Sequence, residues 1–104
     1  MVVKAITDEQ YQEEVETGVS IVDFWATWCG PCRMQSPVLE TVSEDRNDIH
    51  FFKVDVDIGQ ETAASLGIRA IPTLVVHKDG KIVERLTGFH NSEQLVNILN
   101  KYVD

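Results

Sequence analysis

Apolar and polar positions along the chain follow two distinct patterns. Residues 19–25 are apolar on both faces apart from two polar residues, which is typical of a central buried strand, and residues 49–56 predict another strand. Three shorter apolar runs predict further strands, at 2–6, 73–76 and 82–86. Asp79-Gly80 lies between the last two runs and predicts a tight type I′ hairpin, so these two strands are expected to be antiparallel.

Four helices are predicted between and after these strands. Thr7 and Gln10 fit a capping box at the start of the first helix, and Gly18 ends it. Gly67 closes a short third helix over about 61–66. Apolar stripes at helical spacing mark the second and fourth helices, at Met34, Val38, Leu39 and Val42, and at Leu95, Ile98, Leu99 and Tyr102.

The second helix follows two cysteines and ends in the polar run 43–48. Pro37 lies inside this helix and predicts a kink. Asn91 or Ser92 is expected to cap the fourth helix. The element order βαβαβαββα predicts an α/β fold, with helices covering both faces of one mixed sheet.

Composition and charge narrow the possible classes of protein. The chain has 104 residues, 43% apolar and 25% charged, which predicts a single globular domain over 1–104. It has neither an apolar stretch long enough to span a bilayer nor an N-terminal targeting pattern, so a cytoplasmic location is expected. Nine basic residues against seventeen acidic ones give a net charge of -8, which argues against binding to nucleic acid or to anionic membranes.

The two cysteines, Cys29 and Cys32, are separated only by Gly30 and Pro31. A disulfide between them closes a ring of four residues, and such a ring stabilises a fold by only about 2 kcal/mol. A zinc site needs four ligands, and the three histidines are not spaced as ligand pairs, at His50, His77 and His90. The pair is therefore interpreted as a redox couple rather than a structural bridge or a metal site.

The segment around the cysteines resembles the active-site segment of the thioredoxin family, over residues 22–34 with Trp28-Cys29-Gly30-Pro31-Cys32 at its centre. Ile71-Pro72-Thr73 resembles the cis-proline loop of that family. Asp79-Gly80 and Thr87-Gly88 fall where the family has its hairpin turn and groove glycine. The resemblance covers essentially the whole chain, in order and without insertions. It implies the thioredoxin fold, a central mixed five-stranded sheet flanked by four helices, and a monomer.

This placement gives the two cysteines different roles. Cys29 is expected at a helix N-terminus, where unpaired backbone N–H groups and the helix dipole favour the nucleophilic thiolate. It attacks a client disulfide, and the more buried Cys32 then attacks the Cys29 sulfur and releases the reduced client. Gly30 and Pro31 place no charge between the cysteines, which favours a reductant over an oxidant.

Asp23 lies in an otherwise apolar strand, six residues before Cys29. Burial raises the pKa of a carboxyl group, so Asp23 is a candidate acceptor for the proton of Cys32. The resemblance gives the matching aspartate this role and implies that Lys53 tunes it. Two plainer interpretations stay open: a hydrogen-bonded structural carboxylate for Asp23 and an ordinary strand-edge lysine for Lys53.

The resemblance also implies a flat apolar groove for clients, formed by Trp28, Pro31, Ile71, Pro72 and Gly88. Pro72 is expected to be cis and to face the dithiol, which leaves the Ile71 backbone free to pair with an extended client segment. A trans proline at the start of a strand is the alternative.

Other side chains near the motif have weaker assignments. Trp25 is expected in the core, and Arg33 either helps to hold the thiolate or is simply solvated. Gln35 and Thr87 stand where the family usually has aliphatic residues, and His77 stands where an aromatic is common. These departures bear on partner preference rather than on the chemistry. No role is assigned to His50 or His90.

Together these observations predict a thiol–disulfide oxidoreductase that reduces protein disulfides through Cys29 and Cys32. The resemblance implies that a flavin- and NADPH-dependent reductase recharges it, and that it holds no metal and no cofactor beyond its own dithiol. A disulfide isomerase or oxidase is one alternative, which Gly30-Pro31 disfavours. A partner-binding module that uses the same groove is a second alternative, and a metal chaperone is a third.

Overall fold

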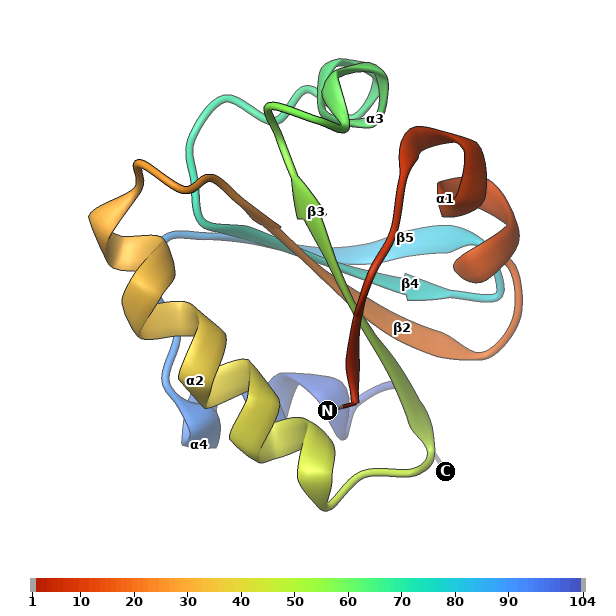
Figure 1. Ribbon diagram of the computed structural model, residues 1–104. Helices are drawn as coiled ribbons and strands as arrows, with labels where there is room; N and C mark the ends of the chain where they lie inside the picture. Colours follow the sequence, from red (N-terminus) through yellow and green to blue (C-terminus); the bar gives the residue numbers. More distant parts are fainter. Residues whose placement is uncertain (1, 104) are drawn as a thin grey trace.

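The computed structural model describes residues 2–103 and shows the predicted order of elements (Figure 1). Five strands and four helices follow one another in the order βαβαβαββα along the described chain. Their bounds are β1 Val3–Ala5, α1 Asp8–Glu14, β2 Val19–Trp25, α2 Gly30–Glu44, β3 Ile49–Asp55, α3 Gln60–Ser65, β4 Thr73–Lys78, β5 Lys81–Thr87 and α4 Ser92–Leu99. None of these helices is both long enough and apolar enough to cross a membrane.

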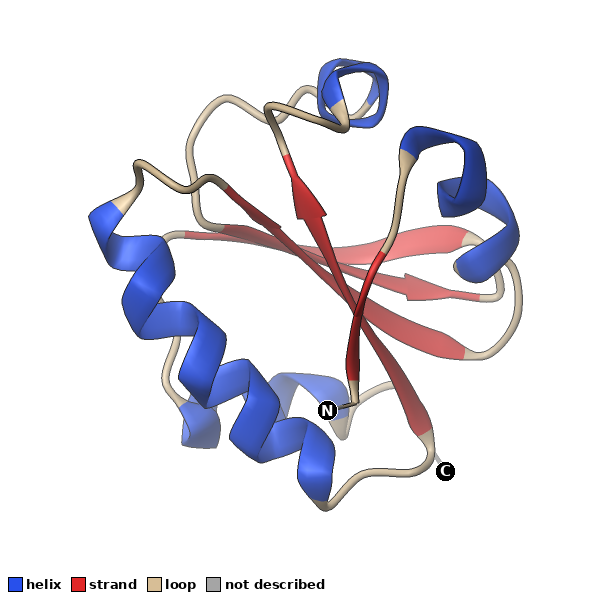
Figure 2. Cartoon of the chain, in the orientation of Figure 1, coloured by secondary structure: helices blue, strands red, loops and turns tan. Residues whose placement is uncertain are grey.

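The strands form one mixed sheet in the order β1-β3-β2-β4-β5, with β2 at its centre (Figure 2). β1 and β2 run parallel to β3, whereas β4 runs antiparallel to both β2 and β5. Asp79 and Gly80, between β4 and β5, have φ angles of 50° and 84°. Two successive positive φ angles are what a type I′ turn requires, so the predicted hairpin is confirmed.

Helices cover both faces of the sheet, as Figure 1 shows. Because successive side chains of a strand point to opposite faces, β2 supplies Ile21 to one side and Phe24 to the other. One core cluster lies under α2 and α4 and includes Ile21, Leu39, Val42, Leu74, Leu95 and Leu99. The other lies under α1 and α3 and includes Tyr11, Val15, Val22, Phe24, Phe52 and Val75. The sheet is therefore buried on both faces.

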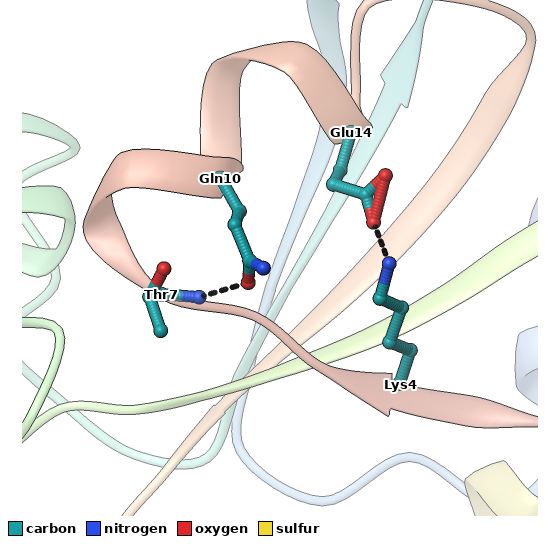
Figure 3. A network of polar contacts seen from close by, with 4 residues as sticks. All are labelled: Lys4, Thr7, Gln10 and Glu14. Carbon is teal, nitrogen blue, oxygen red and sulfur yellow. Dashed lines mark hydrogen bonds and ion pairs between the residues drawn. The ribbon is translucent and has the colours of Figure 1, made fainter.

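The first helix begins where the capping pattern predicts. Thr7 is the N-cap of α1, and its backbone N–H donates to the side-chain oxygen of Gln10, 3.1 Å away (Figure 3). Lys4 and Glu14 form an ion pair of 2.6 Å beside it. This pair is solvent-accessible, so it contributes little to stability. At the other end of the chain, Asn91 caps α4, which settles the choice between Asn91 and Ser92.

The predicted stripe of α2 is wrong at one position. Met34 is 60% exposed, whereas the polar neighbour Gln35 has no exposed surface. The buried face of α2 includes Cys32, Gln35, Leu39 and Val42. These positions are three or four residues apart, and Met34 lies two residues from Cys32, about 200° around the helix. The sequence pattern predicts Met34 on the buried face because it is apolar. The buried face instead follows the positions that lie three or four residues apart, starting from Cys32.

The predicted stripe of α4 is wrong at its last position. The helix ends at Leu99, so Tyr102 lies beyond it. Its hydroxyl donates to the backbone carbonyl of Val83 in β5, at 3.3 Å. Tyr102 still packs against the core, but from the turn that follows α4 rather than from its buried face.

His77 is buried in β4, on the face covered by α1. Its Nε2 lies 3.2 Å from the Tyr11 hydroxyl, and its Nδ1 has no partner among residues 2–103. Burial lowers the pKa of His77 to about 4. The imidazole is therefore neutral at neutral pH, and its charged form is disfavoured inside the fold.

His77→Phe is expected to make the protein less sensitive to acid. An unfolded histidine has a pKa of about 6.5, so below that value the unfolded chain gains a proton that native His77 does not take up. At pH 5 this destabilises the parent by about 2 kcal/mol. The free energy of unfolding, measured with urea at pH 7.5 and pH 5, checks this. His50→Phe, at an exposed histidine, is the matched control. An unchanged pH dependence in His77→Phe would contradict the assignment.

Candidate active site

The two cysteines lie where the central strand β2 passes into α2, and they form a disulfide. Cys29 is the N-cap of α2, and the backbone N–H of Cys32 donates to its Sγ at 3.2 Å. The first turn of α2 contains no acidic residue, so no negative charge within it disfavours a thiolate on Cys29. The predicted position of Cys29 at a helix N-terminus is confirmed.

Cys29 and Cys32 differ slightly in solvent exposure. Cys29 is 5% exposed and Cys32 is 1% exposed, which agrees with the expectation that Cys32 is the more buried. Trp28 lies beside them and is 65% exposed. Its indole Nε1–H donates to the carboxylate of Asp57 at 2.9 Å. Asp57 could not be identified from the sequence, because Trp28 and Asp57 are 29 residues apart and no sequence pattern connects them.

The loop before β4 lies against the dithiol. The Ile71–Pro72 bond is cis, so the alternative of a trans proline is wrong. The carbonyl oxygen of Ile71 lies 3.7 Å from Cys29 Sγ, and Gly88 N–H donates to the Pro72 carbonyl at 2.8 Å. Gly88 has a φ of 88°, a conformation that favours glycine.

The exposed parts of this surface differ from the predicted groove in detail. Pro72 is buried, Ile71 and Gly88 are half-buried, and Gly30 and Pro31 are exposed. Phe89, which directly follows Gly88, is 40% exposed. Sequence reasoning missed Phe89; an aromatic residue next to the predicted groove glycine is the signal that could have found it.

Asp23 is buried in the middle of β2. Its Oδ1 has no hydrogen-bond partner among residues 2–103, which argues against a purely structural carboxylate satisfied by its neighbours. Burial raises the pKa of Asp23 to about 7, although the nearby positive charge of Lys53 opposes this rise. Asp23 therefore has a pKa suited to exchanging a proton near neutral pH.

Lys53 pairs in register with Asp23 across β2 and β3. Since β3 lies between β1 and β2, the interpretation of Lys53 as a strand-edge lysine is wrong. Its ammonium group lies 5.9 Å from the centre of the Trp25 ring, within range of a cation–π contact. Trp25 is half-buried and packs against the dithiol, so it is only partly the core residue expected.

A cavity of about 600 Å³ opens beside this end of α2. Cys32 and Lys53 both line it. The other lining residues are Trp25, Ala26, Thr27, Arg33, Ser36, Pro37 and Glu40. Asp23 is not among the lining residues, but it pairs in register with Lys53, which does line the cavity.

Comparison with known proteins identifies the family. A model of the family described as Thioredoxin matches residues 2–101. The chain belongs to the thioredoxin family. Thioredoxin of Listeria monocytogenes is 48% identical over 102 residues, which cover 97% of this chain and 99% of the relative. Thioredoxin of Staphylococcus aureus is 44% identical over 104 residues, which cover 99% of this chain and 100% of the relative.

Solved thioredoxin structures have the same fold. Thioredoxin of Malassezia sympodialis is 37% identical with a TM-score of 0.86, and the match covers 96% of this chain and 90% of that one. A mutant thioredoxin of Halobacterium salinarum is 34% identical with a TM-score of 0.90, over 97% of this chain and 90% of that one. The predicted thioredoxin fold, a mixed five-stranded sheet with four helices, is confirmed.

Membership of the thioredoxin family also fixes the general activity. The chain is a thiol–disulfide oxidoreductase with a redox-active Cys29–Cys32 pair and protein-disulfide reductase activity. Its general partners are client proteins with disulfides and a reductase. The isomerase, oxidase and binding-module alternatives are not favoured.

Departures from the usual thioredoxin pattern occupy three different environments. Gln35 is buried and hydrogen-bonded to the backbone of His90. His77 packs against Tyr11 on the other face of the sheet, away from the dithiol. Thr87 is exposed at the end of β5. Gln35 is therefore the departure whose side chain forms hydrogen bonds with the segment that follows Gly88.

Arg33 is exposed, as expected, and its guanidinium donates to the carbonyl of Thr27 at 3.0 Å. This bond ties the first turn of α2 to the loop that precedes the cysteines. His50 stacks on Phe52 and makes no contact with the dithiol site. His90, which had no predicted role, lies in the segment that Gln35 contacts.

Proposed function

We propose that Cys29 is the nucleophile and Cys32 the resolving thiol in the reduction of client disulfides. The observation that carries this assignment is the position of Cys29 Sγ at the N-cap of α2, where it accepts the N–H of Cys32. A thiolate at that position gains from the same N–H group and from the helix dipole. Cys32 lies one turn further into the helix and is more buried, so it is suited to the second step.

The reaction is a pair of thiol–disulfide exchanges. The Cys29 thiolate attacks one sulfur of the client disulfide, forms a mixed disulfide and releases the first client thiolate. The Cys32 thiolate then attacks Cys29 Sγ, forms the Cys29–Cys32 disulfide and releases the second client thiolate. Two electrons pass from the dithiol to the client, and the two cysteine protons pass to other bases.

Asp23 accepts the proton of Cys32 in this proposal, and Lys53 tunes the carboxyl group. Burial, the unpartnered Oδ1 and a pKa raised to about 7 support the role of Asp23. The register of Lys53 beside Asp23 and its place in the same cavity wall as Cys32 support the role of Lys53. Its ammonium stabilises the carboxylate and so limits the rise in the pKa of Asp23.

Clients bind across Trp28, Ile71, Pro72 and Gly88, with an extended segment pairing to the Ile71 backbone. The proximity of the Ile71 carbonyl to Cys29 Sγ and the exposure of Trp28 support this surface. Because Pro72 is buried, it shapes the surface rather than contributing exposed area to it.

The proposal includes the source of electrons, the cellular location and the oligomeric state. A flavoprotein reductase that uses NADPH returns two electrons to the Cys29–Cys32 disulfide, and the chain needs no cofactor of its own. Gly30 and Pro31 add no charge that would stabilise the reduced form, which supports a reductant. A reductant of this kind works where thiols are kept reduced, which supports a cytoplasmic location. Residues 1–104 act as one domain and as a monomer.

Cys32→Ser is expected to trap a client through Cys29. The variant can form the mixed disulfide but cannot resolve it, because a serine hydroxyl does not attack the Cys29 sulfur. A covalent complex with a protein that has one accessible disulfide should appear on a non-reducing gel and disappear with excess dithiol. Cys29→Ser is the matched control and should form no complex. Trapping by Cys29→Ser rather than Cys32→Ser would reverse the proposed roles.

A further inference from the structure

Gln35 connects α2 to the loop between β5 and α4. It has no exposed surface, and its amide group meets the backbone of a single residue, His90. Gln35 Oε1 accepts the His90 N–H at 2.8 Å, and Gln35 Nε2 donates to the His90 carbonyl at 3.0 Å. A buried amide is disfavoured unless its polar atoms are paired, and here one backbone position pairs both ends.

The contacts continue from His90 toward the sulfur atoms. His90 Nδ1 lies 2.9 Å from the Gly88 carbonyl oxygen, and Gly88 N–H donates to the Pro72 carbonyl at 2.8 Å. The adjacent Ile71 carbonyl is the one that lies 3.7 Å from Cys29 Sγ. A continuous set of contacts therefore links Gln35 with the loop next to the dithiol.

Phe89 is held in the middle of this set, between Gly88 and His90. It is 40% exposed, so part of this aromatic residue is open to solvent, while the backbone of Gly88 and His90 on either side is hydrogen-bonded. An exposed aromatic ring on a fixed backbone is a good contact for a protein partner, because little conformational freedom is lost on binding. A mobile segment would present the same ring at a larger entropic cost.

We propose that Gln35 is a positioning residue for the binding of protein clients. It holds residues 88–90 so that Phe89 forms one wall of the client surface. This inference rests on the proposed function, because it takes the surface around Ile71 and Gly88 as the place where clients bind. The hydrogen bonds of the Gln35 amide go to the His90 backbone, so in this proposal it acts on client binding and not on the exchange chemistry.

Gln35→Met tests this role, because it preserves length and apolar packing while removing both bonds to His90. We expect KM for a protein disulfide to rise about fivefold to tenfold with kcat unchanged, which is the effect of losing an interaction equivalent to one net hydrogen bond. The rate with a small aliphatic disulfide, which has no extended segment to lie along residues 88–90, should stay within about twofold of the parent. Equal losses with both substrates would overturn the inference.

Two further variants sharpen the comparison. Thr41→Val removes a side-chain bond to the Pro37 carbonyl elsewhere in α2, and it should leave both substrates unaffected. Phe89→Ala should raise KM for the protein client. In the double variant, Gln35→Met should raise KM little further, since both substitutions act through the position of Phe89. Additive effects in the double variant would show that Gln35 does not act through Phe89.

A second variant covers the case in which Gln35→Met fails to fold. Gln35→Leu also removes both bonds to His90, and it fills the buried position with an apolar side chain that carries no charge. We expect a similar increase in KM and faster hydrogen exchange at the Phe89 and His90 amides. Unchanged exchange and KM in Gln35→Leu would contradict the positioning role. If the parent itself fails to reduce protein disulfides, the proposed function is wrong. The hydrogen-exchange measurement then still tests whether Gln35 holds residues 88–90.

Discussion

Replacing Asp23 by asparagine is expected to raise the free energy of unfolding at pH 8 by about 4 kcal/mol. The pKa of Asp23 is about 7 in the fold, because burial raises it, against about 3.9 in an unfolded chain. The carboxyl therefore favours folding only while it is protonated. That contribution is fully present below about pH 4 and is lost as the pH rises through 7. An asparagine side chain carries no charge at any pH, so the gain should vanish below pH 4.

Urea unfolding of the oxidised proteins at pH 4, 6 and 8 measures this dependence. Ser20→Ala is the matched control, because Ser20 is a second buried polar residue of β2 whose Oγ has no partner among residues 2–103. Its effect on stability should be the same at each pH. A gain in Asp23→Asn that does not change with pH would show that Asp23 does not ionise inside the fold.

Asp23→Asn should also slow the second chemical step. Without the carboxylate, the Cys32 proton loses its nearest proposed acceptor, and release of the reduced client should fall by about tenfold to a hundredfold near pH 7. The rate is measured from a preformed mixed disulfide on Cys29. Formation of that mixed disulfide should change little, because Cys29 is activated by the helix N-terminus rather than by Asp23.

Cys29→Ser is expected to lower steady-state reduction of a protein disulfide by at least about a thousandfold. A serine hydroxyl at the N-cap can still accept the Cys32 N–H, so the helix should begin at the same residue. Loss of the four-residue disulfide ring costs only about 2 kcal/mol, so the variant should remain folded.

Turnover with a protein disulfide and an electron donor checks this second prediction. Met34→Ala is the control, since Met34 is an exposed apolar residue of the same helix to which no part in the reaction or the client surface is assigned. It should retain the activity of the parent. Substantial turnover by Cys29→Ser would mean that Cys32 can act as the attacking thiol.

The regular features of this fold could be predicted because each depends on residues close together in sequence. The hairpin followed from Asp79-Gly80, and the start of α1 followed from Thr7 and Gln10. The burial of Asp23 followed from the apolar run of β2 that surrounds it. The pattern of apolar residues and turn or capping residues was sufficient in these cases.

Features that depend on contacts between distant residues could not be predicted in this way. The pairing of Gln35 with His90 could not be seen in the sequence, since the two residues lie 55 positions apart. The link between Trp28 and Asp57 was hidden for the same reason. The position of the active-site segment came from its resemblance to a family, whereas its surroundings required the structure.

The cavity beside α2 and the proposed client surface share no residue. The first is lined by Cys32, Lys53 and their neighbours, and the second is formed by Trp28, Ile71, Pro72 and Gly88. A client that covers the second set leaves the first open. In the proposed reaction, the Cys32 proton would therefore reach water through the cavity while the client stays bound at the other surface.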